Sequence, residues 1–250
     1  MGVKLAAFVA AAALTVPGTV LAAPVSHSAT GCGSGANGST GYAYAGRQAM
    51  HIAHGVRATI TPLAAATVHA GHVAAWIGVG GRGDGPGGSD EWLQAGIASL
   101  PGESTLVYAE IERPGSAPTF VSLLENVQPG QSHRIAVLEI KSRPNWWRVW
   151  LDGAPATDPI HLIGSSGRWK PIATAETSNG GQQVCNSFAF RFDTVGVAAS
   201  RGGSWQTFAP GYRFLDRGYR LTQLRPAPNG TRLSATSAIR PYAFEARSLG

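Results

Sequence analysis

The chain is short of charge and of cysteine. Charged residues make up 14% of its 250 residues, whereas a globular domain has roughly a quarter. Only two cysteines occur, Cys32 and Cys185, which excludes a disulfide-dense small scaffold and a four-cysteine zinc site. After the first 22 residues, no apolar run approaches the length of about 18 residues that a membrane-spanning helix needs. We therefore expect no membrane span in the mature protein.

The N-terminus has the pattern of a secretory signal peptide over residues 1–22. Lys4 precedes an apolar stretch at residues 5–16, and Val20, Leu21 and Ala22 offer a cleavage site. The alternative is an N-terminal membrane anchor, but the apolar stretch is too short to span a bilayer as a stable helix. The pattern predicts a secreted, extracellular protein.

Composition divides the remaining chain into three parts. Residues 23–50 are rich in glycine, serine and alanine, which predicts a flexible arm and a possible propeptide. Residues 51–200 are expected to form one domain. Residues 201–250 hold eight arginines against Asp216 and Glu245, which indicates a basic C-terminal extension. That extension would be either a solvated tail or a contact for an anionic surface. Nucleic acid is not an expected partner of an exported protein.

Export also bears on the two cysteines. In an oxidising compartment, Cys32 and Cys185 are expected to form one disulfide between the N-terminal arm and a late strand. Two free thiols are the alternative.

Short runs of alternating apolar and polar residues predict β-strands throughout the 51–200 region. The chain has 33 glycines and 16 prolines, and the pair Asp152-Gly153 is a strong hairpin signal. No helical pattern follows residue 22. This pattern predicts an all-β fold, a two-sheet antiparallel β-sandwich. The expected strands are 56–61, 72–79, 92–98, 106–112, 119–124, 133–140, 146–151, 172–176 and 188–198.

Several of these strands have one apolar face and one unusual polar face. In the second of them, Val73, Ala75 and Ile77 point one way and Trp76 the other. Tryptophans, a glutamine and carboxylates on one face are typical of a groove for an extended peptide or glycan. The alternative is that these side chains belong to different sheets and that some tryptophans are core residues. The candidates for this face are Trp76, Trp92, Gln94, Tyr108, Glu110, Glu112, Trp146, Trp150 and Glu176.

Three segments resemble the glutamic peptidases (eqolisins, peptidase family G1). The segments are Ala75-Trp76-Ile77-Gly78-Val79, Trp92-Leu93-Gln94-Ala95-Gly96-Ile97 and Ala175-Glu176. The family has Trp-Val-Gly-Ile, Leu-Gln-Thr-Gly-Val and Ala-Glu-Trp segments in the same order. The resemblance covers about residues 70–200 and implies a concanavalin A-like (jelly-roll) sandwich.

The resemblance also implies a mechanism. It makes Gln94 and Glu176 the catalytic dyad of an endopeptidase that activates water and cleaves a peptide or protein substrate without a cofactor. A glutamate can serve as general base, and an amide beside it can donate hydrogen bonds to the developing oxyanion. Two departures stand out. The family's aromatic tract corresponds to residues 108–114, which keep a glutamate and a proline but lose most aromatics, and Thr177 replaces the tryptophan after the glutamate.

Two other functions fit the same residues. A non-catalytic, lectin-like sandwich would hold a glycan or peptide with Trp76, Trp146 and Trp150. A glycoside hydrolase would use Glu110 and Glu112, which share a strand face. No metal is expected, because His51, His54, His69 and His72 are spaced for a helix within a stretch that has no helical pattern.

Overall fold

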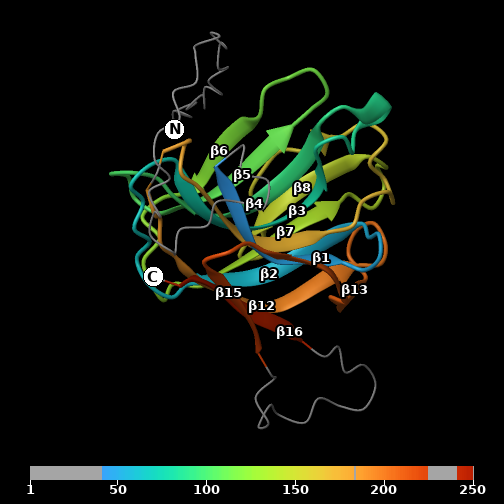
Figure 1. Cartoon of the computed structure of the whole chain (residues 1–250). Coiled ribbons are helices and arrows are strands. Elements are labelled where there is room, and N and C mark those ends of the chain that lie inside the picture. The colour runs from blue at the N-terminus through green and yellow to red at the C-terminus, as the bar shows by residue number, and fades with distance from the viewer. Residues whose placement is uncertain (1–40, 183, 225–240, 250) are drawn as a thin grey trace, which may run out of the picture.

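The computed structural model of the chain describes residues 41–182, 184–224 and 241–249. Two antiparallel sheets pack face to face (Figure 1), and the described part holds a single short 3₁₀ turn, η1 (Pro86–Gly88), as its helical element. The predicted all-β sandwich is therefore confirmed. None of the described segments is a helix of the length and apolarity that would cross a membrane. The expected signal peptide and Cys32 fall outside the described residues, so the secretion signal and the disulfide stay predictions.

The first sheet has seven strands in the order β14-β1-β11-β3-β4-β5-β6. Its centre is formed by β11, β3 and β4, which pair in antiparallel register. The strands are β1 (Tyr42–Ala49), β3 (His72–Gly81), β4 (Glu91–Ser99), β5 (Leu106–Glu112), β6 (Thr119–Leu124), β11 (Ile172–Ser178) and β14 (Pro210–Leu215).

The second sheet has nine strands, seven of them in the order β10-β8-β7-β2-β12-β16-β15. Two short strands complete it, since β9 pairs with β8 and β13 pairs with β12. The strands are β2 (Gly55–Pro62), β7 (His133–Glu139), β8 (Trp146–Leu151), β9 (Ala154–Pro155), β10 (Ile160–His161), β12 (Ala189–Ala198), β13 (Trp205–Thr207), β15 (Tyr219–Leu224) and β16 (Tyr242–Ser248).

The core lies between the two sheets and follows the predicted alternation. Leu93, Ala95 and Ile97 of β4 are fully buried there, as is Trp147 of β8. Each fully buried large apolar side chain contributes roughly 1.5–3 kcal/mol by leaving water. Trp76 belongs instead to a second cluster on the outer face of the seven-stranded sheet. The pleat therefore sends the polar and aromatic side chains of β3 and β4 to the face that carries the candidate site.

The sandwich is larger than the expected 51–200 region. Strand β1 lies inside the sequence expected to be a flexible arm, and β13–β16 lie inside the expected extension. The inward residues of β1 are the small Ala43 and Ala45. Because the segment is rich in alanine and glycine, its composition predicted a flexible arm although one face of the strand is apolar and buried. In the C-terminal region the arginines obscure an alternating pattern in which Tyr242 and Phe244 are buried.

Candidate functional site

A cleft of about 780 Å³ opens on the outer face of the seven-stranded sheet. Its floor comes from the central strands, and β1 and β14 provide one wall. Both members of the expected dyad, Gln94 and Glu176, line this cleft. The lining residues are Tyr42, Tyr44, His72, Trp76, Val79, Gly80, Gly81, Arg82, Trp92, Gln94, Glu110, Ile172, Thr174, Glu176, Tyr212, Arg213, Phe214, Leu215 and Asp216.

The Glu176 carboxylate is held by two side chains of the neighbouring strand β3. His72 Nε2 lies 3.0 Å from Oε1, and Trp76 Nε1 donates to Oε2 at 2.9 Å. Glu176 is 6% exposed. A carboxylate has about four lone-pair sites, so each oxygen keeps one for a water molecule or a substrate. The carboxylate is thus fixed in orientation, and each of its oxygens can accept a further hydrogen bond.

His72 carries a proton more readily than a free histidine. Burial opposes its protonated form, but the hydrogen bond to Glu176 and the charges of Glu176 and Glu110 outweigh burial and raise the pKa of His72. Tyr42 packs edge-on against the imidazole, with ring centroids 5.7 Å apart. Protonated His72 would add a positive charge beside the Glu176 carboxylate.

Gln94 projects from β4 into the cleft. It pairs across the sheet with Gly78 on one side and Glu110 on the other. A Cβ at Gly78 would lie 2.9 Å from the Gln94 Cβ, so the glycine leaves the space that the glutamine occupies. The Gln94 amide Nε2 donates to the Tyr108 hydroxyl at 3.3 Å. This contact uses one of two N–H groups and leaves the other for a ligand.

Glu110 adds a second carboxyl group to the cleft. Trp92 Nε1 donates to its Oε1 at 3.0 Å. Burial, with the negative charge of Glu176 as the next cause, raises the pKa of Glu110 to about 7. Near neutral pH the cleft therefore holds a carboxyl group, that of Glu110, which keeps its proton more readily than a free glutamate does.

The structure separates the predicted groove residues into two groups. Trp76, Trp92 and Glu110 line the cleft with the dyad, and Tyr108 lies beneath it at 2% exposure. Glu112 does not line the cleft, because it sits at the end of β5, buried to 7% exposure with Oε2 unpaired among the described residues. The expected Glu110–Glu112 pair is thus not a pair of cleft carboxylates.

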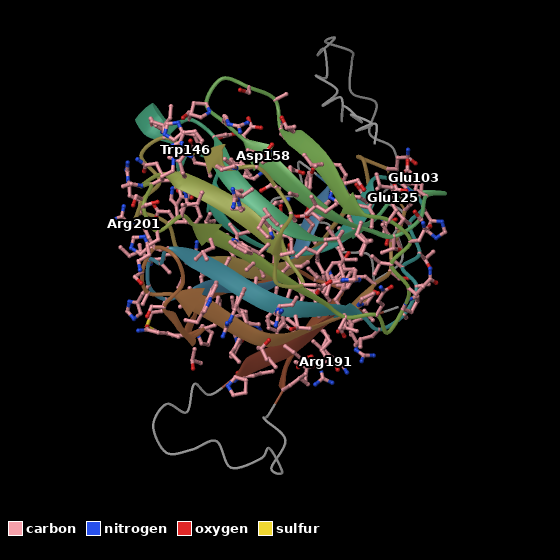
Figure 2. All side chains as sticks on the ribbon, turned by 180° about the vertical axis from the view of Figure 1, so that it is seen from behind. Glu103, Glu125, Trp146, Asp158, Arg191 and Arg201 are labelled. Atoms are coloured by element: carbon pink, nitrogen blue, oxygen red, sulfur yellow. The ribbon has the colours of Figure 1, made fainter. Side chains whose placement is uncertain are left out.

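Trp146 and Trp150 do not belong to this groove. Both point outward from β8, as the alternation predicts, but β8 is in the nine-stranded sheet. Trp146, which is labelled in Figure 2, therefore faces away from the cleft, because the cleft lies on the outer face of the other sheet. The prediction that Trp76, Trp146 and Trp150 hold one ligand together is therefore wrong. Alternation along a strand does not reveal to which sheet the strand belongs.

Several cleft residues were missed by the sequence interpretation. Tyr42 and Tyr44 come from the expected arm, and Tyr212, Arg213 and Phe214 from the expected extension. The signal that could have found β1 is the Tyr-Ala-Tyr-Ala alternation at residues 42–45. Burial and the nearby Glu176 charge raise the pKa of both β1 tyrosines, which keeps their hydroxyl groups protonated as hydrogen-bond donors.

Comparison with solved structures agrees with this architecture. Scytalido-glutamic peptidase, bound to a transition-state analogue inhibitor, superposes with a TM-score of 0.52 at 13% identity, over 84% of this chain and 98% of that chain. SCP-B, a member of the eqolisin family bound to the tripeptide Ala-Ile-His, gives a TM-score of 0.50 at 14% identity over the same shares. The chain has the glutamic-peptidase fold. No protein-family model and no curated protein sequence matches it. At this level of identity the likeness concerns the sandwich, while the role of each cleft residue must be argued from its own contacts.

Proposed function

We propose that the protein is a secreted endopeptidase of the glutamic-peptidase type, with Glu176 and Gln94 as its catalytic residues. The observation that carries the proposal is that both side chains line one open cleft on the sheet face of a sandwich with the fold of those enzymes. Aromatic side chains on the walls of the cleft offer apolar contact to a peptide substrate.

In the proposed reaction, the Glu176 carboxylate takes a proton from a bound water as the oxygen of that water attacks the peptide carbonyl carbon. The free N–H of Gln94 donates to the developing oxyanion. Glu176 then passes its proton to the leaving amine nitrogen, which breaks the C–N bond and restores the carboxylate. Trp76 and His72 act as positioning residues, since their hydrogen bonds orient the Glu176 carboxylate.

The test is proteolysis of a denatured protein substrate from pH 2 to 8 by the purified chain, with and without the part of the N-terminal arm that precedes β1. Glu176→Gln removes the base and Gln94→Ala removes the oxyanion donor. We expect each substitution to abolish cleavage while circular dichroism and the melting temperature stay near those of the parent. Cleavage that survives both substitutions would refute the assignment of the dyad.

A non-catalytic peptide-binding sandwich is the second candidate, and the same cleft supports it. Both oxygens of Glu176 already accept hydrogen bonds within the protein, an arrangement that also suits a fixed acceptor for a ligand N–H group. Peptide binding without turnover at any pH would favour this candidate over the peptidase.

A further inference from the structure

The outer face of the nine-stranded sheet carries a second surface that the peptidase chemistry does not use. It lies on β2, β7, β8 and β13, away from the cleft. Its members are Arg57, Arg134, Ala136, Arg148, Trp150 and Trp205, which we call the Trp–Arg face. Their strand neighbours Val56, Ala58, Ile135 and Val149 are fully buried in the core, so the pleat directs the five residues of β2, β7 and β8 outward, and Trp205 contacts one of them, Arg57.

The register places a shallow trough at the centre of this face. Ala136 of β7 pairs with Arg57 on one side and with Trp150 on the other. Two strand spacings, about 10 Å, separate the backbones of Arg57 and Trp150. The small Ala136 side chain is the only one between them in this row. A flat ring can therefore lie over Ala136 with Trp150 at one side and a guanidinium group at the other.

The guanidinium groups of this face form no ion pair among the described residues, and the acidic contact of Arg134 is made by its main-chain N–H, which donates to Asp152 Oδ1 at 2.8 Å. Elsewhere on the same sheet, Arg191 pairs with Asp193 at 2.7 Å and Arg247 pairs with Glu245 at 2.7 Å. Within the described part of the chain, no such ion pair involves Arg57, Arg134 or Arg148, and the buried Nε of Arg148 has no hydrogen-bond partner there. Burial, and then the charge of Arg134, lower the pKa of Arg57. The face thus gathers uncompensated positive charge, which an anionic ligand would neutralise.

The aromatic side chains determine where the charged groups lie and which ring a ligand can stack on. Trp205 stacks under the Arg57 guanidinium, 4.6 Å from the ring centroid, and so holds it at the edge of the trough. Trp146, at the end of β8, is already occupied by Arg143 at 3.8 Å and by a stacked His161. Trp150 has no ring or cation stacked on it within the described residues. It is the ring available to a ligand.

We propose that the Trp–Arg face binds an acidic polysaccharide. A sugar ring would stack on Trp150 over Ala136, and carboxylate groups of successive sugars would pair with Arg57, Arg134 and Arg148. Guanidinium groups recognise carboxylates through two parallel hydrogen bonds. Single-stranded nucleic acid fits less well, because such sites stack successive bases on several aromatic side chains and the trough offers one. The cleft and this face lie on opposite sides of the molecule, so the chain could hold a glycan and a peptide at once.

The test measures binding of the full chain to polygalacturonate at fixed low salt, with dextran, oligo(dT) and poly-L-glutamate as comparison polymers. The test variant combines Arg57→Gln, Arg134→Gln and Arg148→Gln. The control variant combines Arg191→Gln, Arg220→Gln and Arg247→Gln, which changes the net charge equally on the same sheet (Arg191 is labelled in Figure 2). Trp150→Leu tests the stacking ring separately. Melting temperatures verify that each variant folds.

We expect polygalacturonate to bind and dextran not to bind. Loss of one charge-assisted hydrogen bond corresponds to about tenfold in affinity, so the test variant should bind at least about tenfold more weakly and the control variant nearly as well as the parent. Three results would overturn the proposal: no binding of polygalacturonate, equal weakening in both triple variants, or equal affinity for oligo(dT) or poly-L-glutamate. None of these measurements depends on proteolysis. The glycan proposal can therefore fail while the peptidase proposal holds, and the peptidase proposal can fail while the glycan proposal holds.

Discussion

Substituting Glu110 by glutamine should change how the stability of the protein depends on pH. In the folded chain the pKa of Glu110 is raised from 4.5 to about 7, first by burial and then by the charge of Glu176, while Trp92 and His72 oppose the rise and Glu112 adds to it. In the unfolded chain Glu110 ionises near its ordinary value. Between those two pH values the folded state keeps a proton that the unfolded state has lost.

The sign follows from proton linkage. Because the folded state binds more protons than the unfolded state in this window, the free energy of unfolding falls as pH rises from about 4.5 to about 7. At full effect the difference corresponds to about 3 kcal/mol, and water in the open cleft reduces it. Glu110→Gln cannot ionise, so it should match the parent near pH 4 and exceed its stability by about 2 kcal/mol near pH 8.

The assay is urea unfolding, followed by tryptophan fluorescence, of the parent and the variant at several pH values from 4 to 8. Glu103→Gln is a matched control, since Glu103 is an exposed carboxylate in the turn between β4 and β5. His72, whose pKa is also raised, is present in all three proteins. Parallel stability curves for the parent and Glu110→Gln would refute the reasoning, because they would mean that Glu110 ionises at the same pH in the folded and the unfolded chain.

Three further predictions concern single contacts. Trp76→Phe keeps an aromatic ring but removes the donor to Glu176 Oε2; it should lower kcat for proteolysis by about 10- to 100-fold, the value of a hydrogen bond to a charged group, and an unchanged kcat would contradict the positioning role. Asn186→Ala removes a buried amide that links Ala70, Thr177 and Ser178. Urea unfolding should show that the free energy of unfolding falls by about 2–3 kcal/mol, whereas Gln206→Ala at an exposed position should change it little. Gly96→Ala would place a Cβ 2.0 Å from the Ala75 carbonyl oxygen; a drop in melting temperature equivalent to at least about 2 kcal/mol is expected, and a normal melting temperature would show that β3 and β4 can separate at this point.

Alternation along single strands was enough to predict the pleat. The inward positions of Leu93, Ala95 and Ile97, the outward position of Trp76 and the Asp152-Gly153 hairpin are all as the sequence indicated. At that turn both residues have positive φ, 51° and 92°, as a two-residue hairpin of this kind requires. These features depend on residues that are close together in the sequence, so a short stretch of sequence is enough to predict them.

Strand order depends on distant pairings and could not be read in this way. Nothing near Trp150 in the sequence distinguishes a strand of one sheet from a strand of the other, so the tryptophans of β8 were grouped with Trp76. His72 became a site residue only because β3 pairs with β11, more than 90 positions later, which brings it to Glu176. The walls of the cleft were missed for a related reason, since glycine-rich and arginine-rich composition predicted loose segments where the structure has strands.

Strand β14, which follows all the floor strands in the sequence, supplies one wall of the cleft, and this affects when the site can form. Strand β14 contributes Tyr212, Arg213 and Phe214, and it joins the sheet by pairing with β1, near the other end of the described chain. During synthesis the floor strands β3, β4 and β11 all emerge before this wall, and the pairing must close a loop of more than 150 residues, which is slow compared with local folding. A nascent or C-terminally truncated chain therefore has the dyad but only half of a binding groove. If the protein cleaves other proteins, this order of assembly delays the capacity to hold a substrate until β14 has emerged and paired with β1.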